Sequence, residues 1–199
     1  MKLVFAQGNP GSQYSSTRHN VGWQVLDILA EVKSASWVEK SKFRANICEF
    51  SSGGEKVILA KPTTYYNDTG LSARTLIDFY KLDPSSDIIV LHDELATPLG
   101  DIRVREKGRD AGNNGIKSIN SHIGEDYKRI RIGVGSELRT KVSDTNFVLG
   151  NFTQSETATL KLVYKQAIAC VEQFIADDLV VTKYSVAPVV EPEKTPETE

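Results

Sequence analysis

One histidine, one aspartate and three asparagines are the side chains of this sequence best suited to chemistry. His19 lies in a polar loop, Asp93 follows an apolar run, and Asn9, Asn67 and Asn114 lie in three separate segments. A carboxylate that binds one ring nitrogen of a histidine fixes the tautomer and makes the other nitrogen a better general base. Amide side chains can donate hydrogen bonds to a developing oxyanion without adding charge. The set suits direct attack of water on an activated carbonyl, without a covalent intermediate or a metal.

Signatures of other catalytic and cofactor sites are missing from the sequence. It has no GxxxxGK[ST] phosphate loop, and Gly133-Val134-Gly135 is not followed by the third glycine of a dinucleotide fingerprint. The other histidines, His92 and His122, are far from His19 and form no HExxH pattern with it. We therefore expect neither a cofactor nor a metal. No GxSxG elbow is present, but a serine nucleophile stays open because three serines lie near His19: Ser12, Ser15 and Ser16.

The candidate residues are expected at the ends of strands in an α/β fold. Residues 3–6 and 88–91 are concentrated apolar runs, which predict buried strands. The loop after the first run contains His19, and the second run leads directly to Asp93. A third polar loop, 62–70, also follows a predicted strand. Because strand-to-helix loops leave a sheet at the carboxyl ends of its strands, where open α/β sheets bind ligands, these loops are expected to converge.

Helical and strand periodicities account for most of the remaining chain. Ser155 is a plausible N-cap for a long C-terminal helix, and residues 141–152 are expected to be irregular or to form short helices. The segment Ser51-Ser52-Gly53-Gly54 predicts a hairpin. Further helices are expected from near residue 21, over 71–81 and around 116–123, and further strands over 43–50, 56–61, 102–105 and 130–134.

Composition and charge indicate one globular domain over residues 1–186. The 199 residues carry a formal net charge of −2, but 187–199 hold four glutamates, one lysine and three prolines, which predicts a disordered acidic tail. Residues 100–141 hold ten basic and six acidic side chains, which favours a polyanionic partner, although a solvated face would look the same. The sequence shows no signal peptide or membrane-spanning apolar run, so a cytoplasmic protein is expected. Cys48 and Cys170 are expected to be reduced.

Five blocks of sequence, in order over nearly the whole predicted domain, carry a family pattern. They are Gly8-Asn9-Pro10-Gly11-x-x-Tyr14-x-x-Thr17-Arg18-His19-Asn20-x-Gly22, Lys61-Pro62-x-Thr64-Tyr65-x-Asn67-x-x-Gly70, His92-Asp93-Glu94-Leu95, Asn114-Gly115-x-Lys117-Ser118 and Val148-Leu149-Gly150. With these blocks the chain resembles the bacterial-type peptidyl-tRNA hydrolases. The resemblance implies a single α/β domain with a twisted, mixed and largely parallel sheet flanked by helices. It also implies a monomer that needs no cofactor.

The resemblance further implies an activity and a set of catalytic roles. The reaction is hydrolysis of the ester between a peptide, or another N-blocked aminoacyl group, and the terminal ribose of tRNA, with water as co-substrate. It would recycle tRNA from peptidyl-tRNA during translation. By position, His19 is the general base and Asp93 orients it. Asn9, Asn67 and Asn114 position the peptide, the carbonyl and the attacking water.

Four residues match positions that contact tRNA in the family. Tyr14 would line the tRNA-binding side of the site. Arg103 and Arg105 stand where the family usually has two lysines that clamp the terminal phosphate, and Arg131 matches a basic RNA-contacting position. Such phosphate contacts supply affinity rather than base readout.

The sequence departs from the family pattern at three places. Tyr66 replaces the methionine usual beside Asn67, and Asn113 stands where a histidine is usual. Both residues are expected to bind substrate and to alter the shape of the peptide channel. Residues 106–111 are charged where the family is rich in glycine, which bears on how freely this loop moves as a lid.

Less specific interpretations exist for every one of these residues. The loop around His19 could be a turn, Asp93 a capping carboxylate, and Arg103 and Arg105 a solvated strand face. A protein of the same fold could also bind RNA without catalysis. The presence of His19, Asp93 and the three asparagines argues against that alternative, because a pure RNA-binding protein needs only the basic face.

Overall fold

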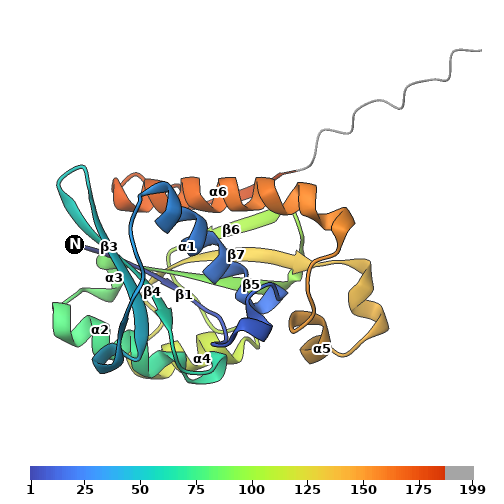
Figure 1. Cartoon of the computed structure of the whole chain (residues 1–199), viewed down its shortest axis with the longest axis horizontal. Coiled ribbons are helices and arrows are strands. Elements are labelled where there is room, and N and C mark those ends of the chain that lie inside the picture. The colour runs from blue at the N-terminus through green and yellow to red at the C-terminus, as the bar shows by residue number, and fades with distance from the viewer. Residues whose placement is uncertain (187–199) are drawn as a thin grey trace, which may run out of the picture.

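A computed structural model describes residues 1–186 of the chain. It contains one sheet with helices on both of its faces (Figure 1). The predicted tail, 187–199, lies outside the described residues. None of the helices in the described part of the chain has the length and apolar character needed to cross a membrane.

The sheet has eight strands in the order β2-β3-β4-β1-β5-β7-β6-β8. Parallel pairing joins β4, β1, β5 and β7 at its centre, and antiparallel pairing joins the strands on both flanks. The predicted α/β fold with a mixed sheet is confirmed, but the expectation of a largely parallel sheet is wrong: three strand pairs are parallel and four are antiparallel. Short connections such as the turn between β3 and β4 can join only antiparallel strands. The strands are β1 (Lys2–Ala6), β2 (Val38–Lys40), β3 (Ala45–Ser52), β4 (Glu55–Pro62), β5 (Ile88–Pro98), β6 (Asp101–Arg105), β7 (Lys128–Gly135) and β8 (Lys183–Ser185).

Two apolar cores lie on opposite faces of the sheet. Helices α1 and α6 pack on one face, and α2 and α4 pack on the other (Figure 1). Side chains of the central strands alternate between the two cores, because successive residues of a strand point to opposite faces. In β5, for example, Ile89 and Leu91 join the first core and Ile88 and Val90 the second. The helices are α1 (Val21–Val32), α2 (Thr69–Tyr80), α3 (Pro84–Asp87), α4 (Asn114–Ile123), α5 (Asp144–Val148) and α6 (Thr157–Ile175).

Three local structures differ from the sequence predictions. The short edge strands β2 and β8 were not expected, because three residues are too few to show a pattern. Strand β5 continues beyond its apolar run: His92, Asp93 and Glu94 still pair with β7. Ser155 is not the N-cap of the last helix. Thr153 caps the short 3-10 turn that leads into α6, and it forms a capping box with Glu156.

Candidate active site

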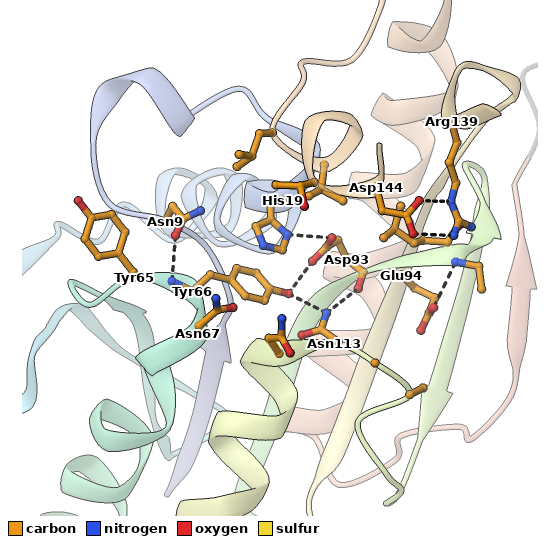
Figure 2. A pocket seen from close by; sticks show the side chains of 18 residues that line it. Asn9, His19, Tyr65, Tyr66, Asn67, Asp93, Glu94, Asn113, Arg139 and Asp144 are labelled. Atoms are coloured by element: carbon orange, nitrogen blue, oxygen red, sulfur yellow. Dashed lines mark hydrogen bonds and ion pairs between the residues drawn. The ribbon is translucent and has the colours of Figure 1, made fainter. Parts of the chain in front are cut away.

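The expected loops converge beside a pocket of about 610 Å³ at the carboxyl ends of the parallel strands (Figure 2). One wall comes from the loops after β1 and β4, and another from β5 itself. The segment before α4 and the residues around α5 complete it. Of the sequence-predicted residues, seven line the pocket: Asn9, His19, Tyr66, Asn67, Asp93, Asn113 and Asn114.

His19 and Asp93 form a hydrogen-bonded pair at the pocket wall. His19 lies in a 3-10 turn, Arg18–Asn20, and its Nδ1 is 2.9 Å from Asp93 Oδ2. The His19 side chain is 17% exposed, whereas that of Asp93 is 2% exposed. An ionised carboxylate can only accept, so Nδ1 of the neutral ring donates and Nε2 keeps its lone pair. The ring is therefore in the tautomer that a general base needs.

Asp93 stays ionised although it is buried. Burial alone would raise the pKa of Asp93, but His19 and the hydrogen bonds from His19 and Tyr66 outweigh it and lower the pKa below its ordinary value. The neighbouring His92 lies on the opposite face of β5, and burial lowers the pKa of His92 to about 4. His92 is therefore neutral near pH 7 and does not compete as a cation for Asp93.

Tyr66 contacts both members of the pair. Its ring stacks on the His19 imidazole, with centroids 3.5 Å apart and planes inclined by 14°. Its hydroxyl donates to Asp93 Oδ1 at 2.5 Å and accepts from Asn113 Nδ2 at 3.0 Å. Asn113 is fixed in turn because its Oδ1 caps α4 by accepting from the backbone N–H of Ile116 at 3.0 Å. The two residues that depart from the family pattern thus touch each other.

Asn9 is held with its amide nitrogen available. The backbone N–H of Tyr66 donates to Asn9 Oδ1 at 2.9 Å, which assigns the oxygen and leaves Nδ2 as a donor at the pocket wall (Figure 2). The Asn20 side chain bonds both the backbone N–H and the carbonyl of Asn9, each at 2.9 Å. Asn67 and Asn114, by contrast, are exposed residues of the lining. The pocket therefore offers one preset amide and two accessible ones.

A buried arginine connects the His19 loop to the segment between α5 and α6. Arg18 is 2% exposed and makes a two-pronged ion pair with Glu156, at 2.9 and 2.7 Å. Its guanidinium carbon also lies 4.5 Å from the centre of the Phe147 ring and 4.7 Å from that of Phe152. Such stacking uses the planar, weakly hydrated guanidinium. The residue next to His19 is therefore tied to α5 and to the start of α6.

Four sequence-predicted contact residues do not line the pocket. Tyr14 is half-buried in the 3-10 turn Ser12–Tyr14. Arg103 and Arg131 are directly opposite each other on β6 and β7, and Arg105 is opposite the buried Arg129. Their side chains therefore share one face of the sheet. Arg131 forms an ion pair with Glu94, a pocket residue.

Sequence reasoning missed part of the lining. Glu94 and Leu95 belong to a block that carries the family resemblance, so a signal for them existed. Asp144 lies in the segment 141–152, expected to be irregular or to form short helices, and Arg139 lies just before that segment. The two side chains pair with each other at 2.8 Å at the pocket opening. Nothing in their spacing marked them. Within residues 1–186 no group of three or more His, Cys, Asp or Glu side chains is placed to hold a metal ion.

Comparison with known proteins identifies the family. The family model described as peptidyl-tRNA hydrolase matches residues 3–193. The chain belongs to this family. The peptidyl-tRNA hydrolase of Fusobacterium nucleatum is 44% identical over 93% of this chain and 96% of its own length. That of Gloeobacter violaceus is 43% identical over 90% of both chains. The crystal structure of the Acinetobacter baumannii peptidyl-tRNA hydrolase superposes with a TM-score of 0.81, at 32% identity and 89% coverage of both chains.

Proposed function

We propose that this chain releases tRNA from peptidyl-tRNA by general-base hydrolysis of the ester that joins the peptide to the terminal ribose. The observation that carries the proposal is the His19–Asp93 hydrogen bond at the wall of the pocket. Family membership supports the choice of substrate, and the geometry of the pair supports general-base chemistry. No feature of the described residues favours an RNA-binding protein without catalysis.

The reaction begins with water held near Nε2 of His19. His19 takes a proton from this water while the oxygen attacks the ester carbonyl, and Asp93 stabilises the imidazolium that forms. The Nδ2 group of Asn9 donates to the negative charge that develops on the carbonyl oxygen. The ribose oxygen leaves with the proton from His19, which returns the ring to its starting state.

Substrate binding is divided between two surfaces. Asn67 and Asn114 bind the peptide and the ester end, while Tyr14 contacts the tRNA side. Arg103, Arg105 and Arg131 bind phosphates outside the pocket, where they raise affinity without reading bases. We propose that the enzyme works as a monomer in the cytoplasm, where its substrate arises.

A release assay tests the activity directly. N-acetyl-aminoacyl-tRNA and its unblocked counterpart are incubated with the full chain, and free tRNA is measured. We expect release from the blocked substrate and much slower release from the free aminoacyl form. Equal rates on both would contradict the substrate assignment, and no release from either would contradict the activity.

A further inference from the structure

We propose that Tyr66 is a positioning residue for His19, rather than a substrate-binding residue as its place in the sequence suggests. This inference rests on the proposed general-base role of His19. Tyr66 would act in two ways: its hydroxyl binds the carboxylate oxygen of Asp93 that His19 leaves free, and its ring supports one face of the imidazole (Figure 2).

The two oxygens of Asp93 are divided between two donors. Oδ2 binds His19 at 2.9 Å, and Oδ1 binds the Tyr66 hydroxyl at 2.5 Å. Burial and the adjacent Asp93 charge raise the pKa of Tyr66 well above its ordinary value, so the phenol keeps its proton and stays a donor. With both oxygens bound, the carboxylate cannot rotate without losing a charge-assisted hydrogen bond. The direction of the His19 ring is therefore set through Asp93.

The Tyr66 ring is itself held in place. Asn113 donates to its hydroxyl oxygen, and its backbone N–H is bound by Asn9. A Cβ atom at Gly115, at the start of α4, would lie 2.3 Å from the ring carbon Cε1. The glycine thus admits the ring against the helix backbone. Because these contacts fix the Tyr66 ring, it can support the His19 ring that stacks on it.

The hydrogen bond from the Tyr66 hydroxyl also reduces the negative charge with which Asp93 acts on His19. Without it, the charge of Asp93 acts more fully on His19 and stabilises the protonated ring, which is inactive as a base. The other charged groups nearby are engaged elsewhere: Glu94 with Arg131, and Arg139 with Asp144. The remaining titratable or charged neighbours on β5 and β7 are the neutral His92 and the buried Arg129, which binds the carbonyls of Gly108 and Arg109.

Tyr66→Phe isolates the hydroxyl, and Tyr80→Phe is its matched control. Tyr80 also donates to a carboxylate, that of Glu49 at 3.2 Å, but on α2 away from the pocket. In Tyr66→Phe we expect kcat to fall about tenfold with KM within about twofold of its starting value. The acidic limb of the kcat profile should move up by about half a pH unit. Tyr80→Phe should change neither.

Tyr66→Leu removes the ring as well, and kcat should fall about a hundredfold because the imidazole loses its support. Circular dichroism and thermal melting show whether each variant is folded. Two results would overturn the proposal: a raised KM with unchanged kcat in Tyr66→Phe, which means substrate binding, or a lower kcat with an unmoved pH profile, which means a structural role.

Nuclear magnetic resonance separates this proposal from the proposed function. The pH titration of the His19 ring is followed in the ligand-free protein, with and without Tyr66→Phe. An upward displacement in the variant supports the contact even if the wild-type chain releases no tRNA. Coincident titration curves refute it even if the wild-type chain is fully active.

Discussion

Two polar regions of this molecule differ in how their charges are balanced. At the His19 end of the pocket, the functional groups already bind one another: His19 with Asp93, and both with Tyr66. We define the arginine face as Arg103 and Arg105 of β6 together with the residues opposite them on β7, Arg131 and Arg129. On this face the charges of the two β6 arginines are not balanced by an ion pair with an acidic side chain in the described part of the chain. Within residues 1–186, Arg105 donates only to the carbonyl of Val104, and Arg103 has no ion-pair partner.

The difference indicates how catalysis and substrate affinity can be assigned to separate regions of the molecule. Buried polar groups are costly unless they are fully hydrogen-bonded, and once bonded they are held in fixed directions. Such an arrangement suits chemistry, which needs precise placement of one proton acceptor. Half-exposed arginines are free to meet phosphates, and their attraction is screened by salt. That arrangement suits affinity for a polyanion.

The largest effect on either region is expected from His19→Ala. Without its general base the chain should release tRNA about 10² to 10⁴ times more slowly, with little change in KM. Single-turnover release from N-acetyl-aminoacyl-tRNA measures this. His122→Ala is the control, because His122 lies at the end of α4 outside the pocket. Full activity in His19→Ala would remove the chemical role from this region.

Glu156→Gln tests how the His19 loop is anchored. The change breaks a buried ion pair with Arg18, and we expect the free energy of unfolding to fall by about 2 kcal/mol in urea titrations. Burial alone would raise the pKa of Glu156, but bonds from Arg18 and Thr153 lower it. A lowered pKa stabilises the fold above the ordinary value of 4.5, and this contribution is lost as the pH falls through the folded value.

The loss caused by Glu156→Gln should therefore be largest near pH 7 and shrink as the solution becomes acid. An Asp144→Asn variant is the control, because Asp144 pairs with an arginine at the exposed opening. A constant difference between wild type and Glu156→Gln from pH 7 to pH 3 would contradict the assigned ion pair.

The arginine face is tested by Arg103→Ala with Arg105→Ala. Removal of two phosphate contacts should raise KM for full-length tRNA about tenfold, flatten its dependence on salt and leave kcat nearly unchanged. A control with the same charge change is Lys161→Ala with Lys165→Ala on α6, which covers the opposite face of the sheet. Equal effects of the two double variants would point to net charge rather than to a binding face.

The smallest effect is expected from Arg139→Ala at the pocket opening. Arg139 pairs with Asp144 and donates to the carbonyl of Leu95 at 3.2 Å. Exposed ion pairs contribute little, so KM should rise only about twofold and kcat should stay the same. Steady-state kinetics at low and high salt measure this. A loss of kcat comparable to that of His19→Ala would mean that the opening belongs to the catalytic region.

The sequence by itself determined the fold class and predicted which side chains meet at the pocket. Concentrated apolar runs such as residues 88–91 predict buried strands, and polar loops that follow them converge at one edge of a parallel sheet. For that reason His19, Asp93 and Asn9 could be named before their contacts were seen. The Gly8-to-Gly22 block carried much of this information, because Asn9 and His19 lie close together in the sequence within one loop.

Only the tertiary structure showed which side chains Tyr66, Arg18 and Arg139 contact. Their partners Asp93, Glu156 and Asp144 follow no sequence spacing, because the folded chain alone brings them within hydrogen-bond reach. The same reason explains the edge strands β2 and β8, whose pairing depends on neighbours distant in the chain. The periodicity of a sequence indicates which side of a helix or strand faces the core. A hydrogen bond between two loops depends instead on the positions that both loops take in the folded chain.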